Sequence, residues 1–151
     1  MLDRERPILS TGDTPVWHTG RPCRDARRSH INYCVCDSGW EADTASLLDR
    51  SPHVAAWVKN DHLGFDVLYL YKGVVRTFLP DFLIHLTNGR RLVLEVKGED
   101  SDRNRTKRRF LAEWVRGVNA DGRFGRWASD VLLDPADIGR ILANHGTSAS
   151  R

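Results

Sequence analysis

The spacing of hydrophobic residues predicts a helix in the first third of this chain. Residues 39–50 carry Trp40 and Leu48 at helical spacing, which is typical of an amphipathic helix packed on a core. The following Ser51-Pro52 should end this helix, because the residue before a proline disfavours helical backbone angles. Upstream, loose alternation over residues 29–35 predicts a short strand.

The middle of the chain alternates between apolar and polar residues, as half-buried strands do. Asn88-Gly89 is the strongest hairpin signal in the sequence, and Lys72-Gly73 marks a second tight turn. We therefore expect a meander of three antiparallel strands, of which the second is interrupted at Pro80. These strands should cover residues 63–71, 74–87 and 91–97, after a short strand or turn over 54–58.

A second helix and a further strand follow the meander. Residues 103–118 show the apolar spacing of a helix packed on a sheet, and Asp102 could cap it. Residues 127–133 predict a strand, and Asp134-Pro135 should open a last helix that ends near residue 143. This order predicts an α/β fold with a mixed four-stranded sheet flanked by helices. The strand after the second helix should join the sheet by a parallel crossover.

The length of 151 residues suits one domain with its own hydrophobic core. We expect that domain over residues 29–144, after an irregular arm or linker remnant over 1–28 and before a polar tail over 145–151. The net charge of +3 permits nucleic-acid binding without requiring it. No apolar run is long enough to span a membrane, and the first residues lack the apolar core of a secretion signal. We therefore expect a cytoplasmic protein that does not contact membranes.

The three cysteines do not form a recognisable framework. An odd count without an export signal argues against disulfide bonds. A single residue separates Cys34 from Cys36, which is too few for a typical zinc site. We expect these two to be buried as small apolar residues.

Charged residues interrupt two of the predicted strands. Asp81 lies in the second strand, and Glu95 and Lys97 share one face of the third because they are two residues apart. A two-residue loop at Asn88-Gly89 would turn Asp81 to the opposite face of the sheet. A three-residue loop over residues 88–90, which pairs Asp81 with Lys97, would bring the three side chains together, and so would a bulge beside Asp81. We predict one of these last two arrangements.

Two carboxylates and a lysine in this pattern favour metal-assisted hydrolysis. Carboxylates that are held close together repel each other, and a divalent cation relieves this repulsion. Carboxylate oxygens and a backbone carbonyl, here that of Val96, suit Mg²⁺ or Mn²⁺ better than zinc. Such a metal lowers the pKa of a bound water, which Lys97 could orient or help to deprotonate. The alternative is a structural salt bridge among Asp81, Glu95 and Lys97.

Pro80-Asp81 and Glu95-Val96-Lys97, separated by thirteen residues, resemble the signature of the PD-(D/E)XK nuclease superfamily. Over about residues 29–143 the chain also resembles the C-terminal nuclease domain of type III-like restriction enzyme subunits that contain a DEAD/DEAH helicase. The segments that carry this second resemblance are Ser38-Gly39-Trp40-Glu41, Trp57-Val58-Lys59-Asn60, Leu63-Gly64-Phe65, Pro80-Asp81-Phe82 and Glu95-Val96-Lys97-Gly98. The resemblance implies a restriction-endonuclease-like αβββαβ core.

The same resemblance implies roles for individual residues. Asp81, Glu95 and the Val96 carbonyl would hold the metal ion, and Glu41 on the first helix would complete the metal site. Lys107 on the second helix is a further candidate for the active site. The structural alternatives are a favourable helix-end charge for Glu41 and an ordinary surface lysine for Lys107.

A run of basic residues opens the second helix. Five cations lie within seven residues, at the helix end where they oppose the dipole. Contact with DNA phosphates would explain their position, and an ordinary solvated helix face is the alternative. The candidate DNA-binding residues are Arg103, Arg105, Arg108 and Arg109, with Lys107 between them.

The pattern and the resemblance together predict a Mg²⁺- or Mn²⁺-dependent endodeoxyribonuclease, the nuclease domain of a restriction-type system. The resemblance implies a helicase or translocase and a methylation or recognition subunit as partners. One alternative is a non-catalytic DNA-binding or assembly module on the same fold. Another is a nuclease of the resolvase or transposon-end type. The sequence leaves the oligomeric state open.

Overall fold

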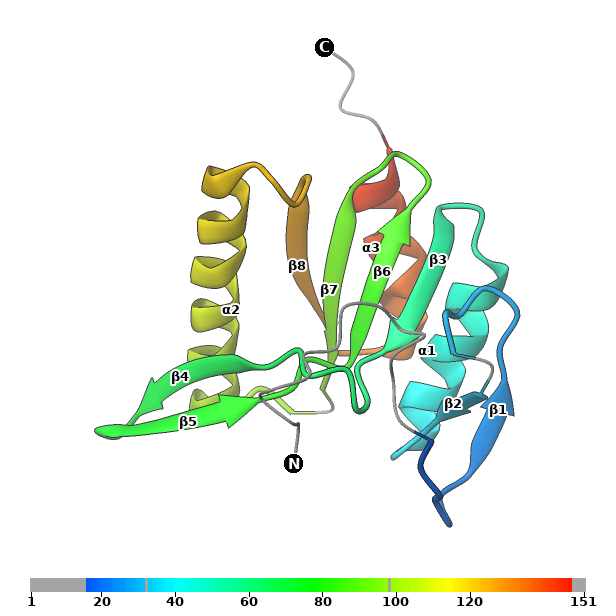
Figure 1. The fold of residues 1–151 in the computed structure, drawn as a ribbon, viewed down its shortest axis with the longest axis horizontal. Coiled ribbons are helices and arrows are strands. Elements are labelled where there is room, and N and C mark those ends of the chain that lie inside the picture. Colours follow the sequence, from blue (N-terminus) through cyan, green and yellow to red (C-terminus); the bar gives the residue numbers. More distant parts are fainter. Residues whose placement is uncertain (1–15, 32, 98, 148–151) are drawn as a thin grey trace.

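The computed structural model of the protein describes residues 16–147 except 32 and 98. Its centre is a four-stranded mixed sheet with the strand order β3-β6-β7-β8 (Figure 1). Each neighbour of β6 runs antiparallel to it, whereas β7 and β8 are parallel. The strands are β3 (Val54–Lys59), β6 (Phe82–Leu86), β7 (Arg91–Val96) and β8 (Trp127–Leu132). The expected mixed four-stranded sheet is therefore present.

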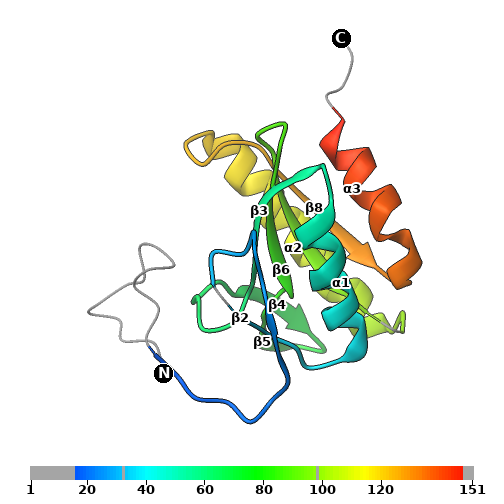
Figure 2. The ribbon, with the colours of Figure 1, turned by 90° about the vertical axis from the view of Figure 1, so that its right-hand side faces the viewer.

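Helices cover both faces of this sheet. Helices α1 (Gly39–Arg50) and α3 (Ile138–Gly146) lie together on one side (Figure 2), where Leu48 packs with Phe82 and Leu94 in the larger hydrophobic core. Helix α2 (Asp102–Asp121) covers the other face, where its Leu111 packs against Val93 of β7. These three α-helices and one short 3₁₀ segment, η2 (Pro135–Asp137), make up the helical part of the described chain.

The ends of the helices follow from their capping residues. Ser38 caps α1 by accepting a hydrogen bond from the Glu41 N–H, and α1 ends at Arg50, two residues before Pro52. Helix α2 is capped by Ser101 and not by Asp102, which is its first residue. It ends at Asp121, and the following Gly122, which has a positive φ of 75°, caps it by donating its N–H to the Val118 carbonyl.

The predicted meander is wrong in one respect, because its first strand is not part of the central sheet. Strands β4 (Val67–Tyr71) and β5 (Val74–Phe78) form a separate two-stranded sheet that packs against α2. The long strand expected over 74–87 breaks at Pro80, which has no N–H for a sheet ladder. The first strand of the meander is β3 instead. Figure 1 shows the β4–β5 hairpin projecting from the body of the protein.

The hairpin between β6 and β7 determines how Asp81 faces Glu95. Its loop has three residues, Thr87, Asn88 and Gly89, closed by a hydrogen bond from the Leu86 N–H to the Arg90 carbonyl at 2.8 Å. The expected loop length is correct, but the loop begins one residue earlier than we expected. The register Phe82 to Leu94 therefore places Asp81 opposite Glu95 and not opposite Lys97. The observed register differs from the expected one by two residues, so Asp81 stays on the same face of the sheet as Glu95 and Lys97.

The N-terminal region is less irregular than expected. Strand β1 (Cys23–Asp25) pairs with β2 (Tyr33–Val35), which is shorter than the strand predicted over 29–35. The backbone N–H groups of Arg27 and Arg28 both donate to Asp49 of α1. Side chains can thus attach this segment to the domain in a way that no local pattern indicates. Residues 1–15 of the expected arm lie outside the described residues.

At the other end, α3 continues to Gly146, three residues beyond its expected end. Residues 148–151 of the expected polar tail lie outside the described part of the chain. No helix among the described residues is both long and apolar enough to cross a membrane.

Candidate active site

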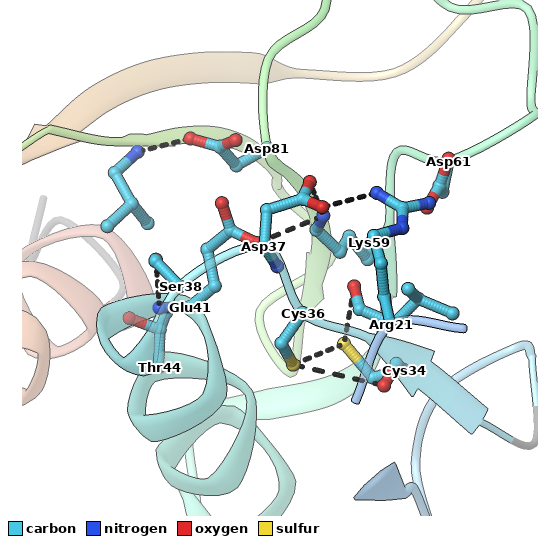
Figure 3. Close-up of polar contacts among 12 residues, drawn as sticks. Arg21, Cys34, Cys36, Asp37, Ser38, Glu41, Thr44, Lys59, Asp61 and Asp81 are labelled. Carbon is cyan, nitrogen blue, oxygen red and sulfur yellow. Dashed lines mark hydrogen bonds and ion pairs between the residues drawn. The ribbon is translucent and has the colours of Figure 1, made fainter. Parts of the chain in front are cut away.

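Asp81, Glu95 and Lys97 lie at the end of the sheet where β6 begins and β7 ends. The Asp81 carboxylate accepts a hydrogen bond of 2.7 Å from the Val96 N–H (Figure 3). The Asp81 carbonyl accepts a second bond, of 2.8 Å, from the Asn60 N–H at the end of β3. Asp81, which directly precedes β6, is therefore held on one side by β7 and on the other by the residue that follows β3.

Glu95 lies almost completely buried on the face of β7 that α2 covers, with 3% of its surface exposed. Its Oε1 lies 3.1 Å from the Lys97 Nζ. Its Oε2 is buried and has no hydrogen-bond partner among the described residues. Burial alone would lower the pKa of Lys97, but the charge of Glu95 and their hydrogen bond outweigh burial and raise it. Lys97 is therefore a cation at neutral pH.

Asp81 has an unusual protonation equilibrium. Burial and the charge of Glu95 raise its pKa to about 7, and Glu41 contributes in the same direction. The hydrogen bond from the Val96 N–H and the charge of Lys97 oppose this rise without cancelling it. Near neutral pH, this end of the sheet therefore favours either a proton on Asp81 or a cation close to it.

Glu41 reaches the same region from the start of α1. Its Oε2 accepts a hydrogen bond of 2.8 Å from the Asp37 N–H and lies 3.0 Å from the Lys59 Nζ. Figure 3 shows its carboxylate extending from the helix towards the side on which Asp81 lies. Glu41 thus has the helix-end position of the structural alternative, and it also contributes charge to the environment of Asp81, as the metal-site expectation requires.

Lys59 is a residue of this region that the sequence interpretation missed. Its side chain is 9% exposed, and its Nζ lies 3.0 Å from Asp37 Oδ2 as well as from Glu41. Burial would lower its pKa, but hydrogen bonds to Glu41 and Asp37 raise it, so Lys59 also remains charged. Arg21 extends this network by pairing with Asp37 and Asp61 (Figure 3). The signal was available, because Lys59 has the same parity as the core residue Trp57.

The chemistry of the donor set fits a hard divalent cation. Asp81, Glu95 and Glu41 supply only oxygen atoms, which is the preference of Mg²⁺ and Mn²⁺. Two of these carboxylates are paired with ammonium groups, Glu95 with Lys97 and Glu41 with Lys59. Within the described residues, no group of three or more His, Cys, Asp or Glu side chains is close enough to hold a metal ion.

The cations of α2 have partners that the sequence interpretation missed. Arg105 and Arg108 both pair with Asp100, which precedes the helix, at 3.4 and 2.6 Å. The Arg103 Nε donates to the Tyr69 hydroxyl at 2.8 Å. Part of this basic run is thus neutralised or held within the protein. The exposed side chains are Arg103, Arg105 and Arg109, with Arg109 over the ring of Phe110.

The side chain of Lys107, on α2, faces the β4–β5 hairpin. Its Nζ is 5.4 Å from the centre of the Phe78 ring and 6.0 Å from that of Tyr69. Lys107, Glu95 and Lys97 line one small hollow. Lys107 is therefore near the candidate site, and its charge faces two aromatic rings. The described ion pairs do not include it.

The cysteines occupy the positions expected for small apolar residues. Cys34 and Cys36 are buried in the larger core with their sulfur atoms 3.7 Å apart, and burial raises the pKa of both thiols. Both are free thiols, as is the exposed Cys23.

No protein-family model, curated protein or solved structure matches this chain.

Proposed function

We propose that the protein is a metal-dependent endodeoxyribonuclease with a restriction-endonuclease-like core. The observation that carries this proposal is the placement of Asp81, Glu95 and Lys97 at one end of the sheet, with Glu41 near enough to raise the pKa of Asp81. The order α1, β3, β6, β7, α2, β8 supports the proposed αβββαβ core, with β4–β5 as an insertion between its first two strands. A salt bridge kept for stability would not need a third carboxylate beside it, because like charges at close range are destabilising.

Each proposed catalytic group has a distinct task. Asp81, Glu95 and Glu41, together with the Val96 carbonyl, would have to draw closer around a divalent cation, because the described side chains do not form a ready metal site. Such an ion supplies a water of lowered pKa and neutralises charge on the phosphate oxygens. Asp81 is aimed by its hydrogen bond from the Val96 N–H, so it needs little reorganisation. Lys97 is charged at neutral pH, so it would orient the attacking water or stabilise developing negative charge rather than act as a base.

DNA would approach the start of α2, which follows β7 directly in the chain. The exposed guanidinium groups of Arg103, Arg105 and Arg109 would contact phosphates near the scissile bond. No pattern in the sequence points to recognition of particular bases. We propose that a helicase or translocase and a methylation or recognition subunit direct the nuclease to its sites.

Plasmid nicking tests this proposal. Supercoiled plasmid is incubated with the protein and Mg²⁺ or Mn²⁺, beside Asp81→Asn, Glu95→Gln and the control Asp43→Asn, which alters an exposed carboxylate on α1. The wild type and the control should nick, and both site variants should lose at least about 100-fold in rate. Equal nicking by all variants would contradict the proposed site. Plasmid binding without nicking under either metal would favour the non-catalytic DNA-binding module.

A further inference from the structure

Two residues that each have a buried polar atom without a partner, Glu95 and Arg108, line one small hollow beneath α2, together with Lys97 and Lys107. Glu95 Oε2 and Arg108 Nη1 are both buried, and neither has a hydrogen-bond partner among the described residues. Both residues line a hollow that offers about 10 Å³ to the centre of a water molecule. Each group has an ion-pair partner at its other end, but a buried polar atom without a hydrogen bond is costly, so two such atoms beside one hollow favour a shared partner.

Arg108 spans the distance from the surface to this hollow. Its Nη2 donates to Asp100 Oδ1 at 2.6 Å, while its Nη1 is buried. A guanidinium keeps its charge at all accessible pH values and has donors on both nitrogen atoms. The side chain is 29% exposed, which is less than the 53% of Arg105. Arg108 is therefore less exposed to a DNA phosphate than Arg105, and it lines the same hollow as Glu95.

Glu95 has one oxygen atom in an ion pair and one without a partner. Oε1 lies 3.1 Å from Lys97 Nζ, and Oε2 is buried without a hydrogen-bond partner among the described residues, beside a hollow that Lys97 and Lys107 also line. A hollow of this size holds about one water, and a buried water needs two or more polar partners. Arg108 Nη1 can donate to such a water, and Glu95 Oε2 can accept from it.

We propose that Arg108 is a positioning residue for Glu95 and acts through one buried water. Nη1–H donates to the water, the water donates to Oε2, and Asp100 anchors the guanidinium from outside. Oε1 is thereby directed to the site. The consequence for catalysis rests on the proposed nuclease function, whereas the water bridge does not.

A crystal structure of the wild-type protein at high resolution tests the bridge itself. We expect density for one water within hydrogen-bond distance of both Arg108 Nη1 and Glu95 Oε2. An empty hollow, or a water that contacts only one of the two atoms, would overturn the proposal whether or not the protein cuts DNA.

Kinetics then test the positioning role with Arg108→Met, Arg108→Lys and the control Arg116→Met on the exposed side of α2. Arg108→Met should lower kcat for plasmid nicking about 10–100-fold with little change in KM, as expected for a group that orients a metal ligand. Arg108→Lys should recover part of the rate, and Arg116→Met should retain it. A raised KM with unchanged kcat would identify Arg108 as a phosphate contact and refute positioning. An inactive wild type would refute the nuclease proposal, and the crystal structure alone would then decide whether the water bridge exists.

Discussion

Replacing Asp81 with asparagine should stabilise the protein at neutral and alkaline pH. Burial and the charges of Glu95 and Glu41 raise the pKa of Asp81 to about 7. Asparagine removes the charge, and its Oδ1 can still accept the hydrogen bond from the Val96 N–H. The candidate site would thus be maintained at a cost in stability, as is usual where like charges are held together for function.

The size and sign of the effect follow from the two pKa values of Asp81. Unfolding would return its pKa from about 7 to 3.8. Between these values the folded protein holds a proton that the unfolded chain releases, so the free energy of unfolding falls as pH rises. One pKa unit corresponds to about 1.4 kcal/mol, which sets a ceiling of about 4 kcal/mol at pH 8. Because the neighbouring carboxylates share the repulsion, we expect about 2–4 kcal/mol.

Urea unfolding between pH 4.5 and pH 8 measures this effect. The stability of Asp81→Asn relative to the wild type should rise with pH and reach its full value near pH 8. The exposed control Asp43→Asn should differ from the wild type by less than about 0.5 kcal/mol at every pH. A difference between Asp81→Asn and the wild type that is constant with pH, or that falls as pH rises, would refute the reasoning.

Three further predictions concern other parts of the structure. Lys59→Met should lower the free energy of unfolding by about 2–4 kcal/mol in urea, because it leaves the buried Glu41 carboxylate without its cation; a loss below about 0.5 kcal/mol would mean that the ion pair is not stabilising. Arg105→Ala with Arg109→Ala should weaken DNA binding and reduce the slope of log K against log salt by up to about 0.9 per lost phosphate contact; an unchanged slope would remove both from the DNA interface. Gly89→Ala should lower the free energy of unfolding in urea by about 1 kcal/mol, because Gly89 has a φ of 86°, which strains a residue with a Cβ. Equal stability of the variant and the wild type would contradict this strain.

Local signals were enough to predict most elements of the fold. Helix α1 and helix α2 have clear apolar faces and nearby caps, and Asn88-Gly89 marks the hairpin between β6 and β7. The sheet that each strand joins was not predictable in this way, because it depends on contacts between residues that are distant in the sequence. Residues 67–78 alternate as a core strand pair would, yet their buried side chains pack against α2. Pro80 marks where the chain leaves the β4–β5 hairpin, before β6 enters the central sheet.

The placement of the candidate site was predictable to a similar extent. The two-residue period puts Glu95 and Lys97 on one face, and the odd-numbered loop brings Asp81 to the same face. The partners of the charged residues were not predictable. Asp100 precedes α2 and pairs with Arg105 and Arg108 at five and eight residues' distance, which the i, i+4 rule of helices does not cover.

Lys59 was missed for a simpler reason. The predicted strand stopped at residue 58, whereas β3 continues to Lys59. One more residue of strand would have turned this lysine towards the core, where a cation needs buried acidic partners. Boundaries of elements therefore matter most where a charged residue stands at the end of a strand.

We propose that this end of the sheet hydrolyses DNA phosphodiester bonds. The most direct test of this proposal is the initial rate of plasmid nicking by Lys97→Met against the wild type in Mg²⁺, with Lys72→Met at the exposed hairpin turn as the matched lysine control. Lys97→Met should lose at least about 100-fold in rate, while Lys72→Met should keep the wild-type rate. Nicking by Lys97→Met at the wild-type rate would contradict the proposal.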